Sequence, residues 1–258
     1  MNYTTAEMMT VSAARALSND DICFVGIGLP SAACNLARLT HAPGITLIYE
    51  SGTIRTRPRV LPLSIGDGEL CESALTTVSV PEMFRYWLQG GRIGIGFLSG
   101  AQMDRFGNLN STVIGDYTHP AVRLPGSGGA SEIATSCGEI FIIMRQSIRS
   151  FAAKLDFLTS LGHGRNGTER AAAGVKTKGP TLGISDLCSM SSDPETKEFV
   201  VRSLHPGVTR RQVRENTGWE IRFAQAVEET PPPNQMELEA LRELNERTAA
   251  AHGVTAGD

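Results

Sequence analysis

The chain lacks the features that would tie it to a membrane, a secretory route or nucleic acid. No stretch of its 258 residues reaches the roughly 18 apolar residues that a membrane-spanning helix needs. The segment Met1–Glu7 has no cationic region followed by a long apolar core, so we expect no signal peptide. A formal net charge of −3 argues against the basic surface typical of a nucleic-acid-binding protein.

Cysteine is scarce and is not arranged in pairs. The five cysteines lie far apart with no C-x-x-C motif: Cys23, Cys34, Cys71, Cys137 and Cys188. This spacing predicts neither a disulfide framework nor a zinc site, and no His, Asp or Glu group has metal-ligand spacing either. We therefore expect no metal, and a reducing cytoplasm as the location.

Two short apolar runs near the start of the chain predict neighbouring strands. They cover residues 22–25 and 44–49, with a helix expected over 31–39 between them. Another helix is expected over 4–17 before them, opened by a capping box at Thr4–Glu7. Alternation of strand and helix favours a parallel sheet with right-handed crossovers. The fold class expected is α/β, with an open, mainly parallel sheet and helices on both faces.

The length fits one domain over residues 1–258, because a chain of this size can bury a full core. A helix over about 234–250, opened by a capping signature at Asn234, is expected to dock on the body. Residues 53–79 are rich in Pro, Gly, Ser and Thr and predict a long irregular excursion. Residues 161–179 turn to Gly, Arg, Lys and Ala and predict a mobile surface segment.

Each of the two predicted strands ends in a group suited to chemistry. Gly26 and Gly28 follow the first, and Glu50 follows the second. Open α/β sheets bind ligands at the carboxyl ends of their strands, although a solvated loop glutamate is the alternative reading of Glu50. A dinucleotide site is disfavoured, since Pro30 and a missing third glycine break the fingerprint.

A glycine cluster, Gly126–Ala130, enters a predicted helix. Backbone amides at such a place can stabilise an anion and form an oxyanion hole, although a plain tight turn fits the same residues. No serine or cysteine has the G-x-S-x-G setting of a nucleophile elbow, and no histidine lies near Cys137 in the sequence. His163 and His205 are therefore expected in turn and surface roles.

Three motifs, in this order, resemble the B (β) subunits of family I CoA-transferases: Gly26-Ile27-Gly28-Leu29-Pro30-Ser31, Tyr49-Glu50-Ser51-Gly52 and Gly126-Ser127-Gly128-Gly129-Ala130. Further agreement comes from Asp104-Arg105-Phe106-Gly107-Asn108, Pro206-Gly207-Val208-Thr209 and Thr217-Gly218-Trp219. The resemblance covers nearly the whole chain and is greatest to the 3-oxoadipate type, with the glutaconate type also near. One departure is Ser51, where many members have Asn.

This resemblance implies the CoA-transferase fold and a role for each motif. Glu50 would be the nucleophile that attacks a CoA thioester, and Gly128 and Gly129 would be the oxyanion donors. The remaining positions would contact CoA or substrate: Gly26, Gly28, Ser51, Gly52, Gly126 and Ala130. Coenzyme A thioester would be a substrate, with no permanently bound cofactor.

The implied function is transfer of CoA from succinyl-CoA to a 3-oxo dicarboxylic acid, 3-oxoadipate, in the β-ketoadipate pathway of aromatic-compound degradation. The implied partner is an A (α) subunit, in an α₂β₂ heterotetramer. Arg55, Arg57 and Arg59 follow Glu50 and would suit a dicarboxylate, although a solvated loop fits them as well.

Other readings stay open. Glutaconate or acetoacetate could be the acceptor, and some members of the fold hydrolyse a cyclic CoA thioester instead. Glu50 argues for transfer, because those hydrolases lack a glutamate at this position. A non-catalytic α/β binding protein is the third alternative.

Overall fold

The computed structural model describes residues 2–253 and falls into two compact units. The first comprises the chain up to Ile95 together with the chain from Pro232 onward, and the second comprises Gly96–Pro231. A single domain over 1–258 stays a prediction. No helix of residues 2–253 is both long and apolar enough to span a bilayer.

The first unit is built on the β-α-β arrangement that the sequence predicts. Its strands are ordered β1-β2-β3-β4, with β1 and β2 parallel and the later pairs antiparallel. The bounds are β1 Ile22–Phe24, α2 Leu29–Leu39, β2 Thr46–Ile48, β3 Thr53–Ile54, α3 Glu69–Glu72, β4 Thr76–Thr77 and α4 Val80–Glu82, followed by a π-helix at Met83–Leu88.

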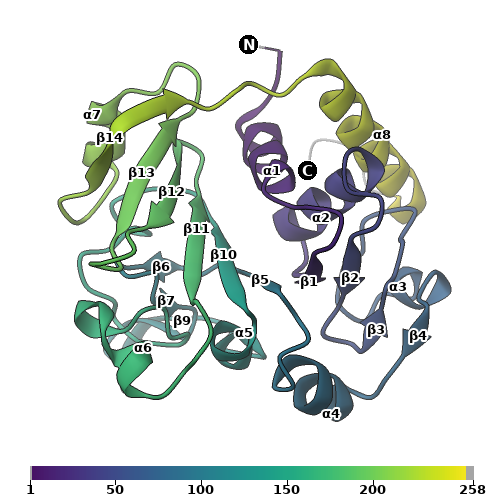
Figure 1. Ribbon diagram of the computed structural model, residues 1–258, viewed down its shortest axis with the longest axis horizontal. Helices are drawn as coiled ribbons and strands as arrows, with labels where there is room; N and C mark the ends of the chain where they lie inside the picture. Colours follow the sequence, from purple (N-terminus) through teal and green to yellow (C-terminus); the bar gives the residue numbers. More distant parts are fainter. Residues whose placement is uncertain (1, 254–258) are drawn as a thin grey trace. The chain divides into compact units, whose positions relative to one another are not determined.

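Two helices from opposite ends of the sequence, α1 (Thr5–Arg15) and α8 (Gln235–His252), complete this unit. Figure 1 shows α1, α2 and α8 side by side, and α8 contacts both of the others. Helices α1 and α8 each open with the predicted capping box, and the Glu of each box also binds an Arg of the other helix. Arg15 Nη2 lies 2.6 Å from Glu237 Oε2, and Arg242 Nε lies 2.6 Å from Glu7 Oε1.

The second unit contains most of the strands. Strand β5 enters it from the first unit, and its sheet runs in the order β5-β10-β11-β12-β13-β14. The bounds are β5 Ile95–Leu98, β6 Gln102–Met103, β7 Leu109–Asn110, β8 Val113–Gly115, β9 Pro120–Arg123, α5 Ala130–Ser136, β10 Glu139–Ile143, a 3₁₀ turn Arg165–Gly167, α6 Glu169–Ala172, β11 Pro180–Ile184, β12 Cys188–Ser192, β13 Phe199–Leu204, α7 Arg210–Glu215 and β14 Arg222–Glu229.

The α/β class is confirmed, and the sheet is mixed. Strands β10–β11 and β13–β14 are parallel, whereas β11–β12 and β12–β13 are antiparallel. The side chains of Phe151 and Phe199 are each at most 1% exposed, and Phe151 stacks on Trp219 with ring centroids 5.8 Å apart. Burial of such large apolar groups is the main source of stability for this unit.

The surface placement predicted for residues 161–179 holds for only part of the segment: residues 171–174 and Lys176 are exposed, whereas other positions are buried, and the mobility of the segment stays a prediction. His163 and Arg170 are both 4% exposed, and the segment contains helix α6. Its backbone is tightly packed, because a Cβ added at Gly162 would lie 2.4 Å from the carbonyl carbon of Gly107. The composition of this segment is typical of a loose loop. Here its glycines allow close packing, and Arg170 reaches buried carbonyls.

Candidate functional site

The structure brings the first glycine turn and Glu50 to one edge of the sheet. Strands β1 and β2 run parallel with Phe24 opposite Ile48, and the amide of Val25 donates to the carbonyl of Ile48 at 2.9 Å. Gly26 and Glu50 are each two residues beyond this matched pair, so both lie at the carboxyl end of the strands. This is the edge where open α/β sheets bind ligands.

Glu50 lies in the tight turn between β2 and β3. The turn is closed by the amide of Gly52, which donates to Tyr49 at 3.0 Å, and by the amide of Tyr49, which donates to Thr53 at 3.1 Å. The Glu50 side chain is half-buried. Within residues 2–253 no hydrogen bond or ion pair engages its carboxylate, so it is free to act as a nucleophile.

Gly52 is required by the geometry of this turn. Its φ is +102°, and a Cβ at this position would lie 1.9 Å from the carbonyl oxygen of Val78. Val78 also donates its amide to the carbonyl of Gly52 at 2.9 Å. Any side chain here would push away the backbone at Val78, directly after β4.

Two hydroxyls flank Gly52 without a partner. Ser51 Oγ and Thr53 Oγ1 are buried and make no hydrogen bond within the described part of the chain. A buried hydroxyl left unpaired costs roughly 1–3 kcal/mol, so such a pair beside Glu50 is unusual. Ser51 places a hydrogen-bonding group directly after Glu50 in the chain.

A network of buried polar side chains links the Glu50 turn to helix α2, and the sequence did not lead us to predict it. The Tyr49 hydroxyl lies 2.8 Å from Ser31 Oγ, and both residues are fully buried. Asn35 Nδ2 donates to the Ser31 carbonyl at 2.9 Å, and Arg38 Nη2 donates to Asn35 Oδ1 at 3.0 Å. Burial raises the pKa of Tyr49, so the phenol stays protonated and neutral at physiological pH. Polar residues at helical spacing within an otherwise apolar stretch were the available signal.

Gly28 begins α2 with a left-handed backbone, at φ +79°. As the N-cap residue it makes no side-chain capping bond, and its carbonyl accepts the amide of Ala32 at 3.0 Å. A cavity of about 550 Å³ lies beside Gly28 and reaches Glu7 and Leu241. The start of α2 therefore borders space that a ligand can enter.

The three arginines after Glu50 are carried away from it. Strand β3 returns antiparallel to β2, with Ile54 opposite Ile48, so each later residue lies further from the carboxyl end of β2. Arg57 Nη2 reaches the carbonyl of Pro43, which precedes β2, at 3.4 Å. The reading of Arg57 as a dicarboxylate anchor beside Glu50 is therefore wrong.

The second glycine cluster lies in the second unit. Gly126 is held at both backbone atoms by Ser111: its amide donates to the Ser111 carbonyl at 2.9 Å, and its carbonyl accepts from Ser111 Oγ at 2.8 Å. Gly128 has φ +47°, and Gly129 is the N-cap of α5. No hydrogen bond within residues 2–253 uses the amides of Gly128 and Gly129, so both are available as anion donors, directly before Ala130 in the first turn of α5.

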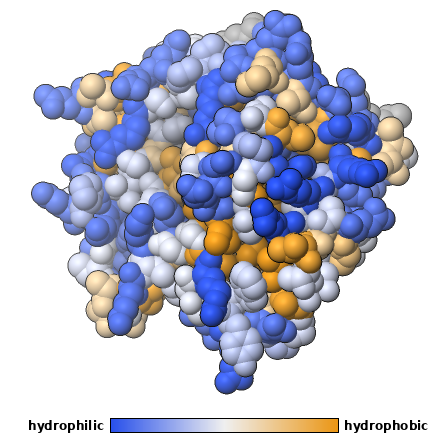
Figure 2. All heavy atoms as spheres, turned by 45° about the vertical axis from the view of Figure 1, so that its right-hand side comes forward, coloured by the Kyte–Doolittle hydropathy of each residue, from blue (hydrophilic) through white to orange (hydrophobic). Residues whose placement is uncertain are grey.

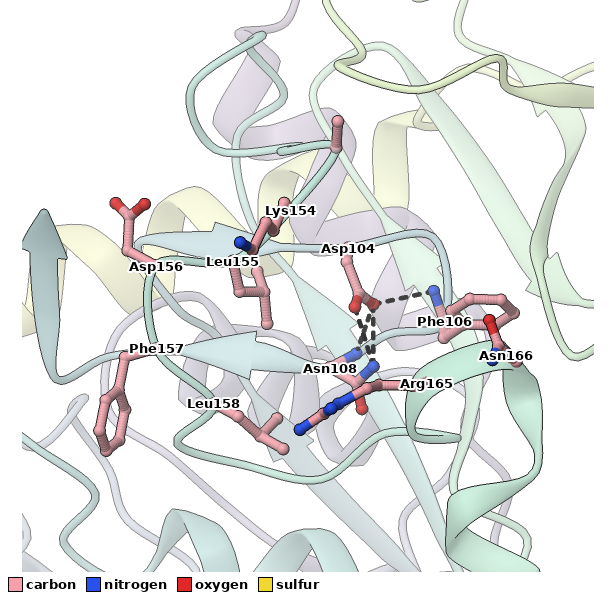
Figure 3. A pocket seen from close by; sticks show the side chains of 11 residues that line it. Asp104, Phe106, Asn108, Lys154, Leu155, Asp156, Phe157, Leu158, Arg165 and Asn166 are labelled. Atoms are coloured by element: carbon pink, nitrogen blue, oxygen red, sulfur yellow. Dashed lines mark hydrogen bonds between the residues drawn. The ribbon is translucent and has the colours of Figure 1, made fainter. Parts of the chain in front are cut away.

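The turn Asp104–Asn108 borders a separate cavity of about 570 Å³ (Figure 3). The Asp104 carboxylate accepts the amide of Phe106 at 2.9 Å and Asn108 Nδ2 at 2.9 Å, and burial raises its pKa. Lys154 and Arg165 supply cations at the wall. The Asp104 carboxylate is committed to its own turn. The other carboxylate of the lining, Asp156, accepts from Gln102 Nε2 and from the amide of Gly115, each at 3.1 Å, so neither is as free as Glu50.

Both candidate histidines are buried, so the surface role predicted for them is wrong. His163 Nε2 lies 2.9 Å from the carbonyl oxygen of Pro180, and His205 Nε2 lies 2.9 Å from that of Ser185. A carbonyl only accepts, so Nε2 carries the proton in each ring. Burial lowers the pKa of both imidazoles, which keeps them neutral and structural. Among residues 2–253 no group of three potential ligands is placed to hold a metal ion.

Comparison with known proteins agrees with the motifs. Residues 6–216 match the family described as Coenzyme A transferase. The chain is 62% identical over 256 residues to the B subunit of 3-oxoadipate CoA-transferase from Pseudomonas knackmussii, covering 99% of this chain and 98% of the relative. It is 37% identical over 245 residues to the B subunit of glutaconate CoA-transferase from Acidaminococcus fermentans, covering 92% and 91%.

A solved structure shows the same fold. The crystal structure of glutaconate coenzyme A-transferase from Acidaminococcus fermentans superposes with a TM-score of 0.90 at 32% identity, covering 96% of this chain and 97% of that one. The chain therefore belongs to the coenzyme A transferase family. Both relatives named above are B subunits, so the subunit type and enzyme class predicted from the three motifs are confirmed.

Proposed function

We propose that the chain is the β subunit of an enzyme that moves CoA from succinyl-CoA to 3-oxoadipate, with Glu50 as the nucleophile. The observation that carries this proposal is the unpaired Glu50 carboxylate at the carboxyl end of β2. The acceptor is inferred from the 62% identity to the B subunit of a 3-oxoadipate CoA-transferase. The corresponding route is the β-ketoadipate pathway, and the corresponding location is the cytoplasm.

The chemistry proceeds through acyl transfer onto the carboxylate. Glu50 attacks the thioester carbon of succinyl-CoA, the C–S bond breaks, and an acyl–glutamyl anhydride and CoA thiolate form. The thiolate then attacks the Glu50 carbonyl, which releases succinate and leaves a glutamyl-CoA thioester. The acceptor carboxylate repeats these steps in reverse order and leaves with CoA, so Glu50 is regenerated.

The glycine motifs supply amide donors for this sequence. Each tetrahedral intermediate carries an oxyanion, and the free amides of Gly128 and Gly129 are the proposed donors. The other motif positions are proposed contacts for the CoA thioester or the acceptor, namely Gly26, Gly28, Ser51, Gly52, Gly126 and Ala130. Coenzyme A is a substrate in this scheme, so no resident cofactor is required.

The proposed partner is a CoA-transferase A (α) subunit, in an α₂β₂ assembly. Support comes from the naming of both relatives as B subunits and from apolar side chains that reach the surface between polar ones (Figure 2). Large hydrophobic side chains exposed in the first unit include Leu63, Leu75, Val80 and Tyr86, at 48–69%. Contiguous exposed apolar patches are typical of protein–protein interfaces, so these side chains are candidates for contact with the A subunit.

Glutaconate is the second candidate acceptor. It is favoured by the similarity to glutaconate CoA-transferase in both sequence and fold. Acetoacetate, which has one carboxylate fewer, is a third. A hydrolase that opens a cyclic CoA thioester is disfavoured because Glu50 is present, and hydrolysis would require water where transfer requires its exclusion.

The test uses this chain co-expressed with its A subunit. We expect succinyl-CoA-dependent CoA transfer with ping-pong kinetics, a higher kcat/KM for 3-oxoadipate than for glutaconate or acetoacetate, and no net thioester hydrolysis. Glu50→Ala should abolish turnover, and Glu50→Asp should lower kcat by about 10²-fold, because the carboxylate is set back by one methylene. Full activity of Glu50→Ala would overturn the proposal, whereas a preference for glutaconate would change only the acceptor.

A further inference from the structure

Arg170 is a buried cation whose charge is met only by neutral oxygens. It lies in α6 and is 4% exposed. Its Nε donates to the carbonyl of Thr177 at 3.1 Å, and its Nη1 donates to the carbonyls of Leu161 and Gly162 at 3.2 and 3.1 Å. Its Nη2 donates to the carbonyl of Ala134 at 2.9 Å and also to Thr177 Oγ1. No ion pair within residues 2–253 involves Arg170.

A buried cation without an ion-pair partner is energetically unfavourable, so we expect Arg170 to have a specific role in the fold. Burying an unpaired cation carries a desolvation penalty of several kcal/mol, which here lowers the pKa of Arg170 to about 10. The side chain therefore still carries its charge at neutral pH. Five fixed donors in one plane can bind several carbonyls at once, which no other side chain can do. The carbonyls it gathers come from two places, the segment 161–179 and helix α5.

The α5 contact is at the C-terminal end of that helix. Ala134 lies in the last turn of α5 (Ala130–Ser136), where unpaired carbonyls point outward and a cation is favourable. Thr177 adds a second link to the same end, because its Oγ1 donates to the carbonyl of Thr135 at 2.9 Å. Arg170 and Thr177 together satisfy carbonyls that the helix itself leaves open.

Close packing against β5 restrains α5 from the side. A Cβ added at Gly96 would lie 2.7 Å from Ile133 Cγ2 and 2.8 Å from Cys137 Sγ. The helix therefore lies directly on the backbone of β5 and cannot move toward it. What this packing leaves undefined is sliding along the helix axis and rotation about it, and the Arg170 contact at the C-terminal end restricts both.

The opposite end of α5 begins at the second glycine cluster. Gly129 is the N-cap, and the free amides of Gly128 and Gly129 precede the first turn. A helix of this length spans only about 10 Å, so a shift at its C-terminal end moves these amides directly. We infer that Arg170 is a positioning residue, which sets the place of the Gly128 and Gly129 amides through α5. This inference rests on the proposed function, in which these amides are the oxyanion donors.

The test compares Arg170→Lys, Arg170→Ala and the matched control Lys176→Met in the co-expressed enzyme. Lys176 is an exposed cation of the same segment. We expect both Arg170 variants to lower kcat by about 10- to 100-fold, in the range for a misplaced oxyanion donor, with KM for succinyl-CoA changed by less than about 3-fold. Guanidinium at low concentration should restore part of the kcat of Arg170→Ala, whereas urea should not. The control should retain its activity.

Several results would overturn the inference. One is an unchanged kcat in a folded Arg170→Ala. Another is a loss of thermal stability with no change in kcat, and a third is equal rescue by urea and guanidinium. Where Arg170→Ala does not fold, Arg170→Lys gives the decision, because it keeps the charge and loses the planar set of donors.

Failure of this inference is distinguishable from failure of the proposed function. If wild-type enzyme forms a covalent adduct at Glu50 and both Arg170 variants form it at the wild-type rate, only the role of Arg170 is wrong. If wild-type enzyme forms no such adduct, the proposed function is wrong and the Arg170 variants are not informative about an oxyanion hole.

Discussion

At the scale of single residues, the Glu50 turn combines one group that is left free with one position that tolerates no side chain. The Glu50 carboxylate has no partner within residues 2–253, which suits a nucleophile that must bond to substrate carbon. Gly52, two residues later, is fixed by its backbone and by the carbonyl of Val78. The Glu50 carboxylate is thus carried by a turn with a rigid backbone, and a rigid backbone helps to position a flexible side chain.

The steric argument at Gly52 predicts a large effect from one methyl group. Gly52→Ala should lower the free energy of unfolding by about 2 kcal/mol or more, because it combines a left-handed backbone with a backbone clash. Gly26→Ala is the control, since its Cβ would meet Pro30 at ordinary contact distances, Cγ at 3.7 Å and Cβ at 3.9 Å, and it should cost less than about 1 kcal/mol. Urea unfolding of both variants measures the difference, and equal losses would contradict the argument.

At the scale of helices and strands, local signals predicted the first unit well. The capping boxes of α1 and α8 and the apolar strands β1 and β2 are found where the sequence placed them. Residue type and spacing decide these features, so they can be predicted from the sequence without knowledge of tertiary contacts. The Glu50 edge of the sheet followed from the same signals.

The structure of the second unit was harder to predict from the sequence, for physical reasons. Strand β14 mixes charged, polar and apolar residues without regular alternation and is mostly exposed, so it has no apolar period to detect. The segment 161–179 looks like a surface loop because its glycines and Arg170 give no sign that distant carbonyls will meet them. Hairpin geometry likewise decided that Arg57 points toward Pro43, which composition alone does not reveal.

The Tyr49–Ser31 contact predicts coupling between β2 and α2. Tyr49→Phe leaves Ser31 Oγ buried without its partner at 2.8 Å, so we expect a loss of about 1–3 kcal/mol in the free energy of unfolding. Ser31→Ala should cost a similar amount, and the double variant should cost less than the sum. A double-mutant cycle by denaturant unfolding measures this, and strict additivity would show that the bond contributes nothing.

At the scale of the whole molecule, two buried neutral histidines predict how stability depends on pH. Burial lowers the pKa of His163 and His205 below the ordinary value of 6.5. As pH falls below 6.5, the unfolded chain binds protons that the folded chain does not, so stability is fully present above that pH and declines below it. Each histidine contributes a slope of at most about 1.4 kcal/mol per pH unit.

Unfolding measured between pH 7.5 and 5.5, in the approximate range above the carboxylate titrations, checks this prediction. His163→Gln and His205→Gln should each flatten the pH dependence of the unfolding free energy, even where they lower its value. His119→Gln alters an exposed histidine and should leave the slope unchanged. A wild-type protein equally stable at both pH values would contradict the assignment of buried neutral rings.

The most direct test of the whole account is to look for the covalent intermediate on Glu50. The chain, co-expressed with its A subunit, is mixed with succinyl-CoA, trapped with borohydride or hydroxylamine, digested and analysed by peptide mass spectrometry. The account predicts modification at Glu50 in the wild-type enzyme and none in Glu50→Gln under the same treatment. An unmodified Glu50, with intact succinyl-CoA still bound, would contradict the central claim that this carboxylate carries the transferred CoA.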